Sequence, residues 1–160
     1  FVDLLGVRDV RVASRSAASA YALADHARAS GAQAQVVADV DAAARDCALV
    51  VTCTPATHIV LRSIPSPRTF IAAVGAFTPT MVEIAPEVCT HCAGQGRVVV
   101  DTPEAVHEAG DLIQAGLEVA TFPTLRDVLA SAAQRPGPVL FKSCGWAGWD
   151  LAAARAAMKP

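Results

Sequence analysis

Short apolar runs recur along this chain, and segments of helical composition separate them. Two of the runs, A-L-V-V-T-C at residues 48–53 and T-F-I-A-A-V at residues 69–74, are apolar along most of their length. Such runs are typical of parallel strands whose two faces are both covered. Strands that alternate with helices at this spacing favour a parallel sheet. The sequence therefore predicts one domain of the α/β class, built on a doubly wound parallel sheet.

Turn and capping residues mark where the predicted elements begin and end. Strands are predicted at residues 9–13, 34–38, 48–53, 69–74, 97–101 and 138–143. Helices are predicted at residues 17–30, 39–45, 86–92, 103–116 with a break near Gly110, 125–133 and 150–158. Ser16 suits the N-cap of the helix at 17–30, and Gly31 suits its end. The proline-containing stretch at residues 55–68 is predicted as a loop.

Ligands of doubly wound sheets lie outside the carboxyl ends of the strands. We therefore predict one rim of strand ends, made of Ser14-Arg15-Ser16, Thr52-Cys53-Thr54, Val74-Gly75-Ala76, Asp101-Thr102 and Lys142-Ser143. Structural interpretations stay open for its members. Gly75 suits the close approach of a ligand, or a tight turn. Lys142 could meet a carboxylate or phosphate, or extend outward to solvent.

The heptapeptide V-R-V-A-S-R-S at residues 10–16 carries the most specific binding signal. In dinucleotide-binding folds, an acidic residue near the end of the second strand binds the ribose of NAD, whereas an Arg accommodates the 2′-phosphate of NADP. This chain has Arg15 between two hydroxyls, Ser14 and Ser16, and no carboxylate there. A guanidinium can hold a phosphate through paired, charge-assisted hydrogen bonds. The site is predicted to bind NADP(H), with an ordinary solvated Arg as the alternative.

Composition excludes several other classes of function. The net charge of −2 and the lack of a basic stripe argue against nucleic acid as a partner. No apolar run is long enough to span a bilayer. The odd number of cysteines, 5, fits reduced thiols in the cytoplasm better than a disulfide scaffold. The C-x-x-C of Cys89 and Cys92 lacks a second ligand pair, so no metal site is predicted.

The chain begins F-V-D-L-L-G, which is typical of the end of a helix that stops at Gly6. A dinucleotide-binding domain whose sequence begins at this helix would lack the domain's first strand and its glycine-rich loop. We therefore expect a Rossmann-type domain that is incomplete at its N-terminus.

Five segments, taken together and in order, resemble the ornithine cyclodeaminase/mu-crystallin family. They are V-R-V-A-S-R-S, C-A-L-V-V-T-C-T-P, F-I-A-A-V-G-A-F-T-P-T-M-V-E, V-V-V-D-T and V-L-F-K-S-C-G-W-A-G-W-D-L-A-A-A. The resemblance covers essentially the whole chain. It implies a cofactor domain at residues 1–145, and a helix at residues 146–160 that returns to a separate substrate-binding and dimerising domain.

The resemblance also implies roles for individual residues in cofactor binding. Ser14, Arg15 and Ser16 match the end of the strand that binds the 2′-phosphate, and Ser19 lies one turn into the next helix. Thr52, Cys53 and Thr54 match the segment that covers the adenosine and its ribose. Val74 and Gly75 match residues beside the nicotinamide and its ribose, and Ser143 matches a late contact. No catalytic residue is predicted here, because the Arg and Lys groups that hold the substrate carboxylate are expected in the other domain.

A departure from the cyclodeaminase pattern separates the branches of the family. Cyclodeaminases carry an acidic residue in a pattern like G-x-D-x-P-G-K, whereas this chain has Phe77 at that position. Phenylalanine cannot accept a proton or hold an ammonium by charge. The G-A-F-T-P form resembles the bacterial reductases of cyclic imino acids, which act on Δ1-pyrroline-2-carboxylate or Δ1-piperideine-2-carboxylate and give proline or pipecolate.

The resemblance therefore implies an NADPH-preferring ketimine reductase, with NAD(H) as the alternative cofactor. A cyclic imino acid is the expected small-molecule partner, and a cytoplasmic homodimer formed through the other domain is the expected assembly. Two alternatives stay open: an ornithine cyclodeaminase or related amino acid dehydrogenase, and a non-catalytic NADPH-dependent binding protein like mu-crystallin.

Overall fold

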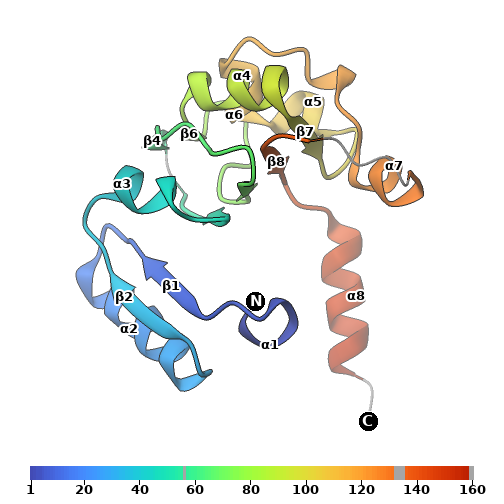
Figure 1. The fold of residues 1–160 in the computed structure, drawn as a ribbon. Coiled ribbons are helices and arrows are strands. Elements are labelled where there is room, and N and C mark those ends of the chain that lie inside the picture. The colour runs from blue at the N-terminus through green and yellow to red at the C-terminus, as the bar shows by residue number, and fades with distance from the viewer. Residues whose placement is uncertain (56, 132–135, 159–160) are drawn as a thin grey trace. The chain divides into compact units, whose positions relative to one another are not determined.

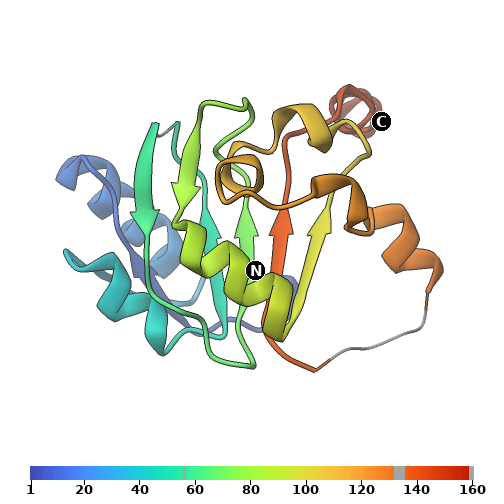
Figure 2. The same ribbon diagram turned by 90° about the horizontal axis from the view of Figure 1, so that it is seen from above.

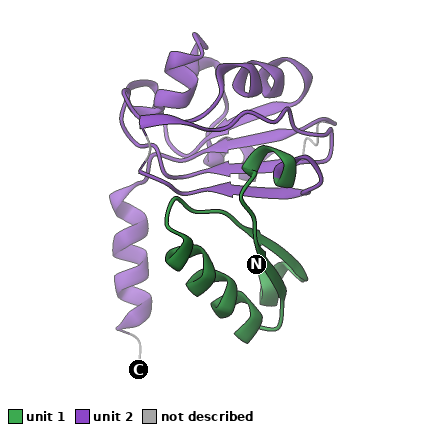
Figure 3. Cartoon of the chain, turned by 90° about the vertical axis from the view of Figure 1, so that its left-hand side faces the viewer, with its two compact units in different colours: residues 1–43 green, residues 44–160 purple. Residues whose placement is uncertain are grey.

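The structure, a computed structural model, describes residues 1–55, 57–131 and 136–158. Its internal contacts divide the chain into two compact units, Phe1–Ala43 and Ala44–Pro160 (Figure 3). All strand pairings among the described residues are parallel, and helices follow most of the strands. The predicted α/β class with a parallel sheet is confirmed.

The first unit is a small βαβ arrangement with its own core. It contains α1 (Val2–Leu5), β1 (Asp9–Val12), α2 (Ala17–Ala29) and β2 (Gln33–Val36). The two strands pair in parallel, with Val12 beside Val36. Val12 packs with the small side chains of Ala20 and Ala24 on α2. Small residues let the helix lie close to the strands, which explains why an alanine-rich helix suits this position.

Three turns of the first unit form as the sequence predicts. The Ser16 hydroxyl accepts a hydrogen bond from the Ser19 N–H at 3.3 Å, which caps α2. Gly6 and Gly31 take left-handed backbone conformations, with φ of 66° and 92°. Glycine adopts such angles without steric cost, so both residues end helical segments where predicted.

The second unit is built on a four-stranded parallel sheet in the order β3-β5-β8-β7. The strands are β3 (Leu49–Thr52), β5 (Phe70–Ala73), β8 (Val139–Lys142) and β7 (Arg97–Val100), and α3 (Val40–Arg45) precedes the first of them. Their last residues pair across the sheet, from Thr52 through Ala73 and Lys142 to Val100. In Figure 1, α4 (Pro86–Gln95), α5 (Ala105–Glu108) and α6 (Gly110–Gln114) lie on one side of these strands. The gap before α6 confirms the predicted break near Gly110.

A second, two-stranded sheet corrects the sequence prediction. β4 (Thr57–Leu61) pairs in parallel with β6 (Val82–Ile84), and both run opposite to the main sheet in Figure 2. The prediction of a loop over residues 55–68 is therefore wrong for residues 57–61. Proline on both sides hides this strand in the sequence, and β6 is too short to show any periodicity. Each segment becomes a strand through its pairing with the other, which neither local sequence indicates.

The remaining elements differ from prediction mainly at their ends. α4 continues to Gln95, and α8 (Ala147–Ala157) begins before the predicted start at Asp150. A short 3-10 helix at Val119–Thr121 was not predicted. The predicted helix at 125–133 is found as α7 (Leu125–Ala130), and its last residues, 132 and 133, lie outside the described residues. No helix in the described part of the chain is long and apolar enough to cross a membrane.

The C-x-x-C pair belongs to the core of the second unit. Cys89 and Cys92 lie on α4 and have no solvent exposure, and both are free thiols. Burial raises the pKa of Cys92 to about 11, and burial together with the charge of Asp111 raises that of Cys89 further. Both residues stay protonated near neutral pH, which suits packing rather than redox chemistry. In the described ranges, no group of His, Cys, Asp and Glu could hold a metal ion.

We predict that alkylation at pH 8 separates these thiols from the exposed Cys53. Iodoacetamide reacts with the thiolate, and the raised pKa values leave Cys89 and Cys92 almost entirely as thiols at this pH. Mass spectrometry of the native protein should find Cys53 modified, and Cys89 and Cys92 modified only after denaturation. Equal modification of all three in the native protein would contradict the buried position.

Two glycines at the end of α4 provide a matched pair of stability variants. A Cβ at Gly96 would collide with the carbonyl oxygen of Pro138, whereas a Cβ at Gly94 meets nothing within 4 Å. We expect Gly96→Ala to lower the free energy of unfolding by about 1–3 kcal/mol through overpacking. Gly94→Ala, within the helix, should raise it by up to about 1 kcal/mol. Urea unfolding measures both, and equal effects would contradict the close contact at Gly96.

Candidate functional site

The carboxyl ends of the four strands of the main sheet lie at one edge of the second unit. The ladder of backbone hydrogen bonds continues one residue beyond the paired strands. The N–H of Val74 donates to the carbonyl oxygen of Thr52 at 2.8 Å, and the N–H of Ser143 donates to that of Ala73 at 2.9 Å. The N–H of Asp101 likewise donates to the carbonyl oxygen of Lys142 at 3.1 Å. The structure thus brings together the predicted rim residues of this unit.

A buried carboxylate, Glu83 of β6, binds the ends of two strands at this rim. Its Oε1 accepts hydrogen bonds from the N–H and the hydroxyl of Thr54, at 2.6 and 2.7 Å. Its Oε2 accepts from the Thr52 hydroxyl at 3.0 Å, the Gly75 N–H at 2.9 Å and the Ala76 N–H at 3.2 Å. Glu83 is completely buried, and these five hydrogen bonds from four residues at the strand ends compensate for its desolvation.

Gly75 is needed where this carboxylate meets the chain. A Cβ at this residue would collide with the backbone of Thr54 and lie 2.6 Å from Oε1 of Glu83. The groups that require a glycine at this position therefore belong to the protein itself, the backbone of Thr54 and the carboxylate of Glu83. A contact between Gly75 and a cofactor stays a prediction.

Lys142 forms a buried ion pair below the same rim. Its Nζ lies 3.0 Å from Oδ2 of Asp111 on α6, and neither side chain has any solvent exposure. The same ammonium group donates a hydrogen bond to the carbonyl oxygen of Ala76. Oδ1 of Asp111 accepts from the N–H groups of Glu83 and Ile84, at 2.6 and 2.9 Å. Lys142 therefore meets a carboxylate of its own chain and does not extend into solvent.

A second buried carboxylate, Asp101, holds the other pair of strand ends. Its Oδ2 accepts from the Ser143 hydroxyl at 2.9 Å and from the N–H groups of Cys144 and Gly145, at 2.7 and 2.8 Å. Its Oδ1 accepts from the Thr102 N–H at 2.8 Å. The hydroxyl of Ser143, a predicted cofactor contact, is thus held by the end of β7.

Several rim side chains remain accessible above these networks. Val74 is 42% exposed and Phe77 is 54% exposed, although Ala76 between them is completely buried. Cys53 is also exposed. Thr52, by contrast, is buried and Thr54 is half-buried, with their hydroxyls on Glu83. An apolar, anchored turn is therefore open to a ligand at the end of β5.

The remaining predicted residues lie on the first unit, where β1 gives way to α2. Ser14, Arg15, Ser16 and Ser19 are all exposed. The Ser14 hydroxyl accepts from the Ser16 N–H at 3.3 Å, while the Ser16 hydroxyl caps the helix. The first turn of α2 carries no acidic residue. A helix N-terminus beside a guanidinium and hydroxyls has the chemistry of an anion site.

Sequence reasoning missed the roles of Glu83 and Asp111. Both are acidic residues within apolar surroundings, V-E-I and D-L-I, and this is the signal that could have indicated them. A carboxylate in such a run is rarely buried unless donors surround it. The donors come from β3, the turn after β5 and β8, so only the assembled unit identifies the partners.

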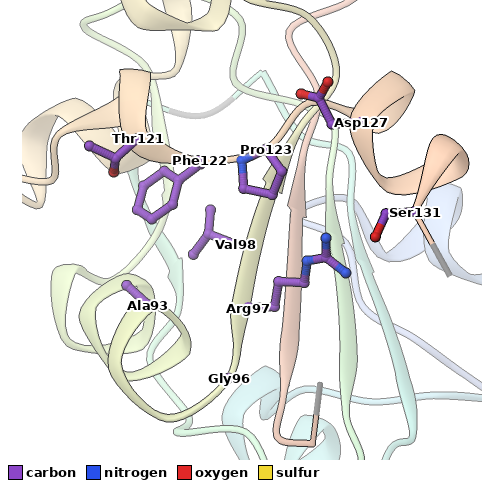
Figure 4. Close-up of a pocket in the computed structure, with 9 residues that line it drawn as sticks. All are labelled: Ala93, Gly96, Arg97, Val98, Thr121, Phe122, Pro123, Asp127 and Ser131. Atoms are coloured by element: carbon purple, nitrogen blue, oxygen red, sulfur yellow. The ribbon is translucent and has the colours of Figure 1, made fainter. Parts of the chain in front are cut away.

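A cavity of about 650 Å³ lies elsewhere on the second unit, along β7. Figure 4 shows its lining side chains, among them Arg97, Val98, Phe122 and Asp127. Hydrogen bonding from the Thr124 side chain lowers the pKa of Asp127, whose carboxylate caps α7 with Thr124. None of the predicted site residues lines this cavity, so it does not coincide with the rim.

Comparison with known proteins places the chain in a family. The sequence profile of the ornithine cyclodeaminase/mu-crystallin family matches residues 1–158. The Δ1-pyrroline-2-carboxylate/Δ1-piperideine-2-carboxylate reductase of Azospirillum brasilense is 40% identical over 149 residues, which are 92% of this chain and 46% of that protein. Δ1-pyrroline-2-carboxylate reductase 2 of Burkholderia ambifaria is 44% identical over 110 residues, which are 68% of this chain and 34% of that protein. The chain spans about half the length of these relatives or less.

Solved structures support the fold. An archaeal alanine dehydrogenase dimer with bound NAD matches with a TM-score of 0.81 at 23% identity, over 95% of this chain and 49% of that one. The Δ1-pyrroline-2-carboxylate reductase of Thermococcus litoralis, in complex with NADH and L-proline, matches with a TM-score of 0.79 at 21% identity, over 92% of this chain and 48% of that one. The fold is thus of the Rossmann type, and the chain belongs to the ornithine cyclodeaminase/mu-crystallin family.

Proposed function

We propose that the protein containing this chain reduces cyclic imino acids, Δ1-pyrroline-2-carboxylate or Δ1-piperideine-2-carboxylate, with a preference for NADPH. The observation that carries this proposal is the 40% identity to a reductase of both compounds along 92% of the chain. The accessible apolar turn around Phe77 supports it, because an acidic group for ornithine chemistry is missing there. The solved reductase with NADH and L-proline adds support for this class of substrate.

The first unit would bind the 2′-phosphate of the cofactor. Arg15 is exposed and forms no hydrogen bond or ion pair with any other described residue, so its guanidinium is available. Ser14, Ser16 and Ser19 would add hydroxyl donors beside the N-terminus of α2. No carboxylate of the first helical turn opposes a phosphate there. These features fit NADPH better than NADH, which remains the alternative cofactor.

The second unit would hold the rest of the cofactor. Thr52, Cys53 and Thr54 would cover the adenosine and its ribose at the end of β3. Val74, Gly75 and Ser143 would lie beside the nicotinamide ribose and ring. When bound in its reduced form, the nicotinamide would supply the hydride for the imine carbon, and a proton would be needed at the imine nitrogen.

The chain's own contribution to the reaction would be binding, orientation and exclusion of water. The anchored turn at the end of β5 would present Val74 to the ring, and Phe77 would cover an apolar pocket. Groups that hold the substrate carboxylate are expected in the family's other domain, and no residue of this chain is assigned to catalysis.

We also propose an arrangement for the whole protein. Residues 1–145 would form the cofactor domain, and the helix from residue 146 onward would pack on the substrate domain. α8 has no buried residue within this chain, which fits a partner outside it. A cytoplasmic homodimer is proposed, because the cysteines are free and the similar archaeal alanine dehydrogenase is a dimer.

The first test measures NADPH oxidation by the complete natural protein with Δ1-pyrroline-2-carboxylate, followed at 340 nm with NADH in parallel. We expect rapid consumption of NADPH and slower consumption of NADH. Cofactor binding without consumption would favour the binding-protein alternative. Release of ammonia from ornithine with equal use of NADH would favour the cyclodeaminase.

The second test removes the proposed phosphate ligand with Arg15→Ala. The loss of charge-assisted hydrogen bonds should weaken NADPH binding about 10- to 100-fold and leave NADH binding nearly unchanged. Isothermal titration measures both dissociation constants, and Arg8→Ala, another exposed arginine of the first unit, is the control. If both cofactors are weakened alike, the phosphate role of Arg15 is wrong.

A further inference from the structure

Two buried charges of opposite sign hold the two backbone groups of a single residue, Ala76. Its N–H donates to Oε2 of Glu83 at 3.2 Å, and its carbonyl oxygen accepts from Nζ of Lys142. Ala76, Glu83 and Lys142 all have no solvent exposure. The backbone at this residue is therefore fixed in place and orientation by charge-assisted hydrogen bonds, which are stronger than neutral ones.

The fixed residue lies in the turn that follows β5, between two exposed apolar side chains. Val74 is 42% exposed and Phe77 is 54% exposed. Turns with exposed apolar side chains are normally mobile, because little packing holds them. Here the side chains stay open while the backbone beneath them is anchored. That combination suits a preformed surface for a flat apolar group at the carboxyl edge of the sheet.

The same carboxylate extends the constraint to the neighbouring strand. Glu83 also accepts from the N–H and hydroxyl of Thr54 and from the hydroxyl of Thr52. A single anion thus sets the spacing between the end of β3 and the turn after β5. Asp111 completes the arrangement, since it accepts from the N–H of Glu83 and pairs with Lys142.

The geometry requires an anion rather than an amide at residue 83. Each oxygen of Glu83 faces at least one backbone N–H, that of Thr54 at Oε1 and those of Gly75 and Ala76 at Oε2. A glutamine would turn an NH₂ group toward one of these sets. In either orientation, at least one backbone N–H would lose its acceptor and face a donor.

We propose that Glu83 and Lys142 are positioning residues of the reductase: by fixing Ala76, they hold Val74 and Phe77 in the arrangement that receives the nicotinamide ring and the imine. This inference rests on the function proposed above. Neither residue is exposed, so neither touches substrate or cofactor, and each acts through the residues that it holds. Lys142 acts through Ala76, whereas Glu83 acts through this turn and the end of β3. Their loss should therefore affect hydride transfer more than cofactor affinity, which depends mainly on the phosphate end.

The test compares Glu83→Gln with the unmodified complete protein, with NADPH and Δ1-pyrroline-2-carboxylate as substrates. We expect kcat to fall about 10- to 100-fold, since misplacement by about 1 Å can cost that much, while the KM for NADPH changes less than about threefold. The deuterium isotope effect on kcat, measured with NADPH deuterated at C4, should rise because hydride transfer becomes more rate-limiting. Glu87→Gln, on the exposed face of α4, is the matched control and should leave all three unchanged.

Asp111→Asn provides a second route if Glu83→Gln does not fold. Its amide oxygen can still accept from residues 83 and 84, while the ion pair with Lys142 is lost. The same pattern is expected on a smaller scale, with kcat reduced by about three- to tenfold. The inference would be overturned if either variant kept the isotope effect of the unmodified protein and lost activity only in proportion to the fraction of its molecules that is unfolded.

The fluorescence emission of bound NADPH, recorded without substrate, tests this inference separately from the proposed reaction. If the unmodified protein binds NADPH but reduces no imine, the proposed function fails. A shifted emission maximum in Glu83→Gln would still support the positioning role. An emission spectrum identical to that of the unmodified protein, or no NADPH binding by the unmodified protein, would overturn it.

Discussion

The second unit depends on a buried carboxylate that is surrounded by donors. Placing an isolated charge in a protein interior costs many kcal/mol, and such a group survives only where hydrogen bonds replace its water. Glu83 has five of these bonds, and they come from β3 and from the turn after β5. Its own strand is held in turn by Asp111, whose other oxygen pairs with Lys142. Loss of Lys142 would leave the Asp111 carboxylate buried without its counter-charge, and loss of the Glu83 carboxylate would leave the N–H groups at the strand ends without an acceptor.

A parallel sheet explains why carboxylates gather at this edge. Where strands end together, the N–H groups of the following residues no longer have a ladder to join, yet buried ones need an acceptor. Glu83 accepts from Thr54, Gly75 and Ala76, beyond β3 and β5. Asp101 does the same for Cys144 and Gly145, beyond β8. Each carboxylate thus ties neighbouring strand ends, which leaves the side chains above them free to contact a ligand.

The first unit, by contrast, is organised by interactions between residues that are close in the sequence. Its core consists of small and β-branched side chains, and the features proposed to bind the cofactor depend only on the local junction of β1 and α2. The cap by Ser16, the exposed guanidinium of Arg15 and the lack of an acidic residue in the first turn all follow from adjacent positions in the chain. The phosphate-binding role proposed for this junction would therefore need no long-range network, unlike the turn at the end of β5.

The sequence by itself determined the strands of the main sheet, the break before Gly110, the cap at Ser16 and the position of Arg15, because each rests on local periodicity, capping or backbone freedom. Only the tertiary structure decided the pairing of β4 with β6, the burial of Lys142 and the roles of Glu83 and Asp111. Those features depend on groups far apart in the chain. The partners of Glu83 and Lys142 are up to 66 residues away, and no local pattern specifies which donor meets which acceptor. A buried charge is defined by its surroundings, and these exist only once the strands have come together.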